Sequence, residues 1–233
     1  MELFSNTEYD YVLLNQLLIA AGIISILCFI ISVVNKNYSQ VDRLWSILPS
    51  IYTLWILFYS RIKDGEFSTK LFLTNFIVNL WSIRLTYNFY RKGGYSVGNE
   101  DYRWEYVKTF IPNRVLFEIF NLTFISFYQN YLILFFALPD YFVYLNRNKS
   151  FSFLEIAFIG LFLFFLLIEG VADNQQWRFQ QEKKKLKETN EIEFFEEYKS
   201  GFIQSGLFQY SRHPNFFSEI MIWWCFYLNI SFF

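Results

Sequence analysis

Histidine and cysteine are scarce in this chain, and their scarcity limits the chemistry open to it. Its 233 residues include one histidine, His213, and two cysteines, Cys28 and Cys225. A zinc site takes about three or four ligands from such residues, so we predict no metal site. Both cysteines lie inside predicted apolar helices, which favours packing over a disulfide. Ser211 stands near His213, but no Gly-x-Ser-x-Gly turn frames it, which argues against a serine hydrolase.

Charge, glycine and proline are also in short supply. Charged residues make up 18% of the chain, against about 25% in soluble domains, and the net charge of −1 argues against nucleic acid as a partner. Nine glycines and four prolines leave few breaks. By contrast, 31 Phe and 17 Tyr are more aromatic residues than one small core can bury. A lipid bilayer is therefore the predicted solvent. The predicted fold class is all-α, a polytopic membrane helical bundle that forms a single domain over residues 1–233.

Six apolar segments approach the roughly 20 residues that a helix needs to cross a bilayer. They are residues 12–34, 44–59, 71–90, 115–138, 151–172 and 216–233. The second segment is short, and a re-entrant loop there would leave five spans. The first is too long for the core of a signal peptide and lacks a basic region before it, so we interpret it as a retained helix.

The loop charges predict the orientation of these six spans. The loops at 35–43, 91–114 and 173–215 together hold 14 of the 20 Lys and Arg residues. Positive charge gathers on the cytoplasmic side of membrane proteins. Both termini are therefore predicted to be non-cytoplasmic, and the cytoplasmic loops are predicted to form a cofactor site.

Two motifs lie at the mouths of these loops. The run Asp42-Arg43-Leu44-Trp45 suits an ordinary interfacial anchor, with Asp42 as a helix cap. In the run from Asn99 to Trp104, Arg103 could grip a phosphate while the aromatic rings hold a flat group. The same run would equally suit an amphipathic helix on the headgroups.

The third predicted span carries a polar face. The spacing of Arg84, Tyr87, Asn88 and Arg91 places all four on one side of a helix. An arginine inside a span faces protein, water or a bound anion. A buried structural ion pair and a functional face are both compatible with this pattern.

Two acidic residues and a charged run follow the fifth predicted span. Glu169 and Asp173 are four residues apart, so they share a helical face that points at the loop region. The run 177–189, rich in Gln, Glu and Lys, is interpreted as a solvated extension of the helix without chemistry of its own.

The most informative stretch comes just before the last predicted span. Arg212 offers a fork for phosphate and His213 a donor near neutral pH. Pro214 suits the first turn of a helix, whose backbone amides would add to an anion site. Asn215 and Glu219 then lie one turn apart. Four polar residues at a membrane boundary are costly to keep, which indicates a ligand site.

These residues resemble a known family. The motif Gly206-Leu207-Phe208-x-Tyr210-Ser211-Arg212-His213-Pro214-Asn215-Phe216-Phe217-x-Glu219 is similar to the C-terminal hallmark of a membrane family of unknown function related to steroid 5α-reductases. The upstream runs Asp42 to Trp45, Glu100 to Trp104 and Glu169 to Phe179 resemble the same family in the same order.

The resemblance implies an endoplasmic-reticulum membrane enzyme that binds NADPH from the cytosol. It would reduce a carbon–carbon double bond conjugated to a carbonyl in a hydrophobic, lipid-like or sterol-like substrate. Tyr87 is the expected catalytic residue that polarises the carbonyl. The expected cofactor-binding residues are Arg103, Asp173, Tyr210, Arg212, His213, Asn215 and Glu219.

Other functions stay open at this point. Relatives continue past the position of Phe233 to a basic segment that completes the cofactor pocket, so we expect a shortened chain. Isoprenylcysteine carboxyl methyltransferases also place Arg-His-Pro before a membrane helix and bind S-adenosylmethionine there. A double-bond isomerase and a truncated, non-catalytic paralogue are the remaining alternatives.

Overall fold

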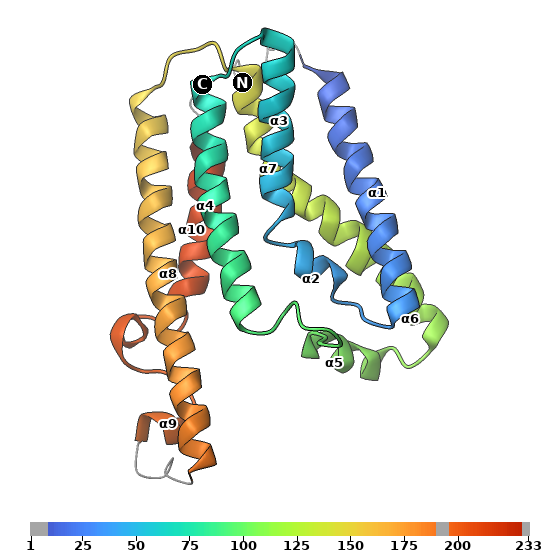
Figure 1. The fold of residues 1–233 in the computed structure, drawn as a ribbon, viewed down its shortest axis with the longest axis vertical. Coiled ribbons are helices and arrows are strands. Elements are labelled where there is room, and N and C mark those ends of the chain that lie inside the picture. The colour runs from blue at the N-terminus through green and yellow to red at the C-terminus, as the bar shows by residue number, and fades with distance from the viewer. Residues whose placement is uncertain (1–8, 190–195, 230–233) are drawn as a thin grey trace. The chain divides into compact units, whose positions relative to one another are not determined.

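The computed structural model describes residues 9–189 and 196–229, and every regular element in these ranges is a helix. The all-α prediction is therefore confirmed. The chain divides into two compact units, Met1–Ser152 and Phe153–Phe232. Figure 1 traces the helices of each unit along the chain.

The first unit is built on four long packed segments, which are α1, α3, α4 and the continuous run from α6 through α7. Its helices are α1 (Tyr11–Asn35), α2 (Gln40–Leu44), α3 (Leu48–Asp64), α4 (Thr69–Arg91), α5 (Tyr102–Phe110), α6 (Arg114–Phe120), the π-helix η1 (Asn121–Tyr128) and α7 (Gln129–Leu145). Helix α3 packs against α4 and α7, while α1 packs against η1 and α7 (Figure 1). Large side chains such as Trp81, Tyr52 and Tyr141 are fully buried between them.

Interhelical hydrogen bonds also hold the first unit together. Asn75 Nδ2 donates to Thr53 Oγ1 at 2.9 Å, and Ser50 Oγ donates to an oxygen of Asn79 at 2.6 Å, so that α3 is joined to α4. Such hydrogen bonds between side chains of neighbouring helices add to their packing.

A carboxylate at the start of α1 joins three helices. Asp10 caps α1 by accepting from the amide of Leu13 at 3.1 Å. Its oxygens also accept from Lys63 Nζ of α3 and from the hydroxyl of Tyr144 of α7, both at 2.7 Å. Burial alone would raise the pKa of Asp10, but these hydrogen bonds hold it well below its usual range.

The second unit is a helical hairpin. Helix α8 (Phe153–Glu188) is followed by α9 (Glu196–Ser200), the short 3-10 helix η3 (Gly206–Gln209) and α10 (Pro214–Asn229), which packs along α8. At 36 residues α8 is about 54 Å long, well beyond the roughly 30 Å of a hydrocarbon core. The prediction that the charged run after residue 177 extends the fifth apolar segment as a helix is confirmed.

Three helical segments are long and apolar enough to cross a membrane, among the residues that the structure describes. They are Tyr11–Asn35, Arg114–Leu145 and Phe153–Glu188. Helices α3, α4 and α10 correspond to the other three predicted segments but do not meet the same standard of length and apolarity. The last four residues of the segment 216–233 lie outside the described residues. The predicted end of the fourth segment at residue 138 is wrong. Helix α7 continues through Pro139 to Leu145, because an internal proline removes only one backbone donor and membrane helices tolerate this.

Candidate functional site

The C-terminal motif begins at a glycine that no other residue type could replace without strain. Gly206 has φ of 61°, in the left-handed region. A β-carbon there would lie 2.6 Å from Nε2 of Gln175, whose Oε1 accepts the amide of Leu207 at 3.0 Å. Gln175 of α8 therefore fixes the start of the motif through a side chain lying across Gly206.

A second bond joins α8 to the first turn of α10. Asn215 Nδ2 donates to Oδ1 of Asp173 at 3.2 Å, and Asp173 is only 5% exposed. Pro214 is the first residue of α10, as predicted from its missing amide, and its side chain is buried. Two of the predicted cofactor residues, 42 positions apart, are thus direct partners.

Three predicted site residues line one cavity in this unit. Arg212, His213 and Asn215 stand at its border, together with Gln176 and the apolar side chains of Phe202, Ile203 and Phe208, around a volume of about 460 Å³. Arg212 and His213 are exposed, so both are accessible from solvent. The cavity is therefore lined by the guanidinium of Arg212, the imidazole of His213 and the amide of Asn215, together with apolar side chains.

The other two residues of the motif lie off this cavity. Tyr210 is 82% exposed and is not part of the lining. Glu219 accepts a hydrogen bond from Trp223 Nε1 at 2.9 Å, one turn further along α10. Their cofactor-binding roles stay predictions.

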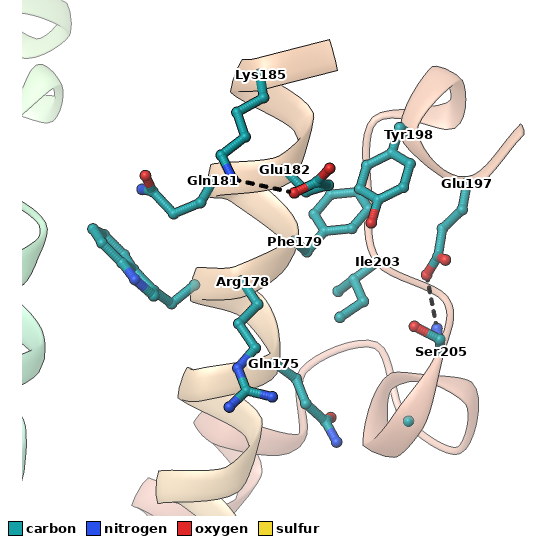
Figure 2. Close-up of a pocket in the computed structure, with 12 residues that line it drawn as sticks. Gln175, Arg178, Phe179, Gln181, Glu182, Lys185, Glu197, Tyr198, Ile203 and Ser205 are labelled. Carbon is teal, nitrogen blue, oxygen red and sulfur yellow. Dashed lines mark hydrogen bonds and ion pairs between the residues drawn. The ribbon is translucent and has the colours of Figure 1, made fainter. Parts of the chain in front are cut away.

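A larger cavity lies along the charged extension of α8, where no chemistry was predicted (Figure 2). Its volume is about 710 Å³, and Gln175, Phe179 and Glu197 are among its lining residues. Phe179 stacks on Tyr198 with 4.9 Å between ring centroids. Glu197 accepts from the amides of Gln204 and Ser205 at 2.7 and 3.0 Å, which holds the pKa of Glu197 below its usual range.

In the first unit the two weak loop motifs are direct partners. Asp42 accepts from Trp104 Nε1 at 2.8 Å and from Arg103 Nη2 at 3.1 Å. Glu100 accepts from the amide of Tyr38 at 2.7 Å, which adds a second link between the loops. The interpretation of Asp42 as a plain helix cap is wrong, because Ser39 is the N-cap residue of α2 and the side chain of Asp42 binds Trp104, 62 positions away.

Arg103 forms ion pairs with two carboxylates of the first unit. Besides Asp42 it pairs with Asp101, with 2.8 Å between Nε and Oδ1. Its hydrogen bonds to Asp101 raise the pKa of Arg103, while burial raises the pKa of Asp42 against the opposing effects of Trp104 and Arg103. The residue lies in the first unit, whereas the other predicted cofactor residues belong to the second.

These loops close one end of an aromatic cavity of about 390 Å³. Asp42, Asp101 and Arg103 form its polar end. The remaining lining residues are Trp45, Ser46, Leu85, Phe89, Phe124, Tyr128, Gln129 and Leu132. Phe124 and Tyr128 come from the π-helix η1 and stack with 5.2 Å between centroids. Such helices are rare and frequent at functional sites.

Tyr87 lies on α4 in the first unit and is 60% exposed. The guanidinium of Arg91 lies 5.6 Å from its ring centroid, and Arg91 Nε donates to Asn88 at 2.9 Å. The predicted common face of Arg84, Tyr87, Asn88 and Arg91 is therefore confirmed for the last three of these residues. Tyr87 is not among the residues lining the aromatic cavity, so its catalytic role stays a prediction.

The fold by itself defines the class of protein. Within the described residues it is all-helical, and three of its helical segments are long and apolar enough to cross a bilayer. Residues 28–231 match the family described as "Protein of unknown function (DUF1295)", and the chain belongs to this family. It is 40% identical over 204 residues to a protein of Schizosaccharomyces pombe named "Uncharacterized protein C594.04c". That alignment covers 85% of this chain and 59% of the yeast protein, so the chain spans less than two thirds of this relative's length. No solved structure matches the chain significantly.

Proposed function

We propose that this chain is part of a membrane oxidoreductase that uses NADPH to reduce a conjugated carbon–carbon double bond in a lipid or sterol-like substrate. The observation that carries the proposal is the cavity of about 460 Å³ bordered by Arg212, His213 and Asn215. Its supports are the buried Asp173–Asn215 bond and the resemblance of the motif 206–219 to a membrane family related to steroid 5α-reductases.

The residues at this cavity fit a dinucleotide. Arg212 presents a planar donor fork suited to phosphate oxygens, and His213 adds a second donor. Asn215 is oriented by its bond to Asp173, which frees its amide oxygen to accept from a ligand. Arg212 and His213 would hold the phosphates, and Asn215 with Asp173 would orient the polar groups nearer the reacting end.

The chemistry divides between the cofactor and the chain. When bound, NADPH supplies a hydride to the β-carbon of the conjugated bond and leaves as NADP⁺. The chain's part is to bind and orient the substrate, to exclude water, and to polarise the carbonyl through a hydroxyl donor while the α-carbon takes up a proton. Tyr87 is the residue we assign to the carbonyl.

The proposed setting is a multi-pass protein of the endoplasmic reticulum with six spans. Helices α3, α4 and α10 would each cross the bilayer in addition to α1, the segment Arg114–Leu145 and α8. The excess of Lys and Arg in alternate loops favours this orientation, in which NADPH enters from the cytosolic face.

Nucleotide binding tests the proposal directly. Calorimetry on the purified full chain in detergent would compare NADPH, NADH and S-adenosylmethionine. We expect selective binding of NADPH, and we expect Arg212→Gln to weaken it by about 10-fold or more, because a hydrogen bond to a charged group contributes about 1.5–3 kcal/mol. Arg178→Gln is the matched control, since Arg178 is in the same unit but lines only the larger cavity.

The other outcomes identify the alternatives. Binding of S-adenosylmethionine alone would assign the chain to the methyltransferases. No binding of any of the three would favour a non-catalytic protein. Equal weakening by Arg212→Gln and Arg178→Gln would show that the cavity bordered by Arg212 is not the site.

A further inference from the structure

Two cations flank the ends of two membrane-length helices at the same end of the first unit. Lys36 follows directly after Tyr11–Asn35, and Arg114 is the first residue of Arg114–Leu145. A hydrogen bond of 2.8 Å from Asn121 Nδ2 to Ser32 Oγ joins these helices near that end (Figure 1). The segment Arg114–Leu145 has 32 residues and is about 48 Å long, against about 30 Å of hydrocarbon, so its ends reach the headgroups.

A cavity of about 410 Å³ lies between these two cations. Lys36, Lys108 and Arg114 supply three positive charges to its lining, and Tyr38, Ile111, Pro112 and Phe117 supply the rest. Lys108 is paired with Glu100 at 2.9 Å. Within the described residues, neither Lys36 nor Arg114 forms an ion pair.

Two buried aromatic side chains are part of the lining of this cavity. Tyr38 and Phe117 are 8% and 4% exposed and meet edge to face, with 4.7 Å between centroids. The hydroxyl of Tyr38 donates to Glu118 at 2.7 Å. Burial and the neighbouring Glu118 raise the pKa of Tyr38 to about 12, so the phenol stays neutral. The ammonium of Lys108 lies 4.6 Å from the Tyr38 centroid, which fixes its position over the ring.

Exposed apolar side chains lie within two residues of Lys36 and Arg114 in the sequence. Val34 on α1 is 73% exposed, and Val115 and Leu116 on α6 are 69% and 57% exposed. A free phosphate ion would gain nothing from contact with these apolar side chains, whereas the acyl chains of a lipid would cover them. Cations at headgroup level beside an apolar surface are the pattern that recognises anionic lipid.

We propose that this cavity binds the phosphate of an anionic phospholipid, with Lys36 and Arg114 as its main contacts and the acyl chains along α1 and α6. The site shares no lining residue with the cavity bordered by Arg212 and does not rest on the proposed function. This proposal places the end of the first unit that carries Lys36 and Arg114 at the headgroups of an anionic membrane.

Lipid counting by native mass spectrometry tests the site. The full chain in detergent would be titrated with phosphatidylglycerol or phosphatidylcholine. We expect tighter binding of phosphatidylglycerol and a loss of about 25-fold in the Lys36→Gln/Arg114→Gln variant, about fivefold for each cation near an anionic lipid. Lys184→Gln/Lys187→Gln removes the same charge from exposed positions of α8 and should change binding less than about twofold.

A second variant, which should tighten lipid binding, distinguishes loss of the site from loss of folding. Glu100→Gln releases Lys108 from its ion pair and should tighten phosphatidylglycerol binding about fivefold. Three results would overturn the proposal: no preference over phosphatidylcholine, equal effects in the two double variants, or no gain in Glu100→Gln. Displacement of the lipid by equimolar inorganic phosphate or glycerol 3-phosphate would identify a free phosphate site and also overturn it.

Discussion

Replacement of Gly206 by alanine should loosen the whole C-terminal motif. Gly206 has φ of 61° and begins the turn that leads to Arg212 and His213. The side chain of Gln175 lies across it and accepts the amide of Leu207. A β-carbon at Gly206 would lie 2.6 Å from Gln175 Nε2.

The cost can be worked out from two contributions. The left-handed conformation costs a residue with a β-carbon about 1–2 kcal/mol. Gln175 is flexible and can move aside, but its hydrogen bond to Leu207 is then lost, which removes about 0.5–1.5 kcal/mol. We therefore expect Gly206→Ala to destabilise the motif locally by about 2–3 kcal/mol.

Hydrogen exchange read by mass spectrometry on the detergent-solubilised chain is the direct assay. Exchange of the segment 204–212 should accelerate by about 30- to 100-fold, since 1.4 kcal/mol corresponds to a factor of ten in the opening equilibrium. Gly160→Ala is the control. Gly160 lies in α8, and a β-carbon added there would have open space around it, so alanine should stabilise the helix slightly.

A double variant separates the two contributions. Gln175→Ala alone should cost about 0.5–1.5 kcal/mol through the lost hydrogen bond. Gly206→Ala added to it should then cost only the 1–2 kcal/mol or so of the backbone. The reasoning is refuted if Gly206→Ala leaves exchange of 204–212 unchanged, or if the two substitutions are fully additive.

Three further predictions concern stability. Asp42→Ala leaves the indole N–H of Trp104, which is 4% exposed, without its acceptor. The free energy of unfolding of the first unit should therefore fall by about 1–3 kcal/mol. Adding Trp104→Phe to the same chain removes the unpaired donor and should recover part of this loss. Thermal unfolding in micelles measures both, and an additive double variant would contradict the pairing. Asp10→Asn weakens hydrogen bonds to Lys63 and Tyr144 and should cost about 1–3 kcal/mol, against no change for the exposed Glu105→Gln. The lowered pKa of Glu197 means that its contribution is complete above its unfolded value of about 4.3 and is lost as pH falls through the lower folded pKa. Amide exchange of Gln204 and Ser205 should therefore accelerate in acid, and a flat profile there would refute the role of Glu197.

The helices themselves could be predicted from the sequence. The segment 12–34 corresponds to α1 and 71–90 to α4, each within two residues at either end. These boundaries follow from long apolar runs bounded by polar residues, which is a local signal. The eight-residue π-helix η1 has no such signal, because its apolar sequence reads like the α-helical segments around it.

The candidate site could be predicted only in part. Arg212, His213 and Asn215 stand in one short motif, so their common location follows from the chain alone. The partnership of Asp42 with Trp104 could not be predicted, because it joins loops 62 positions apart, each of which also suits a plain interfacial role. The part of Gln175 was missed as well, although the glycine at the start of the motif was a signal that some group lies close to the backbone there.

The sequence by itself determined that the chain is helical and apolar enough for a bilayer. It also contains the whole of the motif that ends at Glu219. These features depend on hydrophobicity and on residues near one another along the chain. Only the tertiary structure decided that Arg103 is neutralised by Asp42 and Asp101, that Asp173 orients Asn215, and that Lys36 and Arg114 border one cavity. The physical reason is that the charge and accessibility of a polar side chain are set by the groups packed around it, and packing brings these groups from distant parts of the chain.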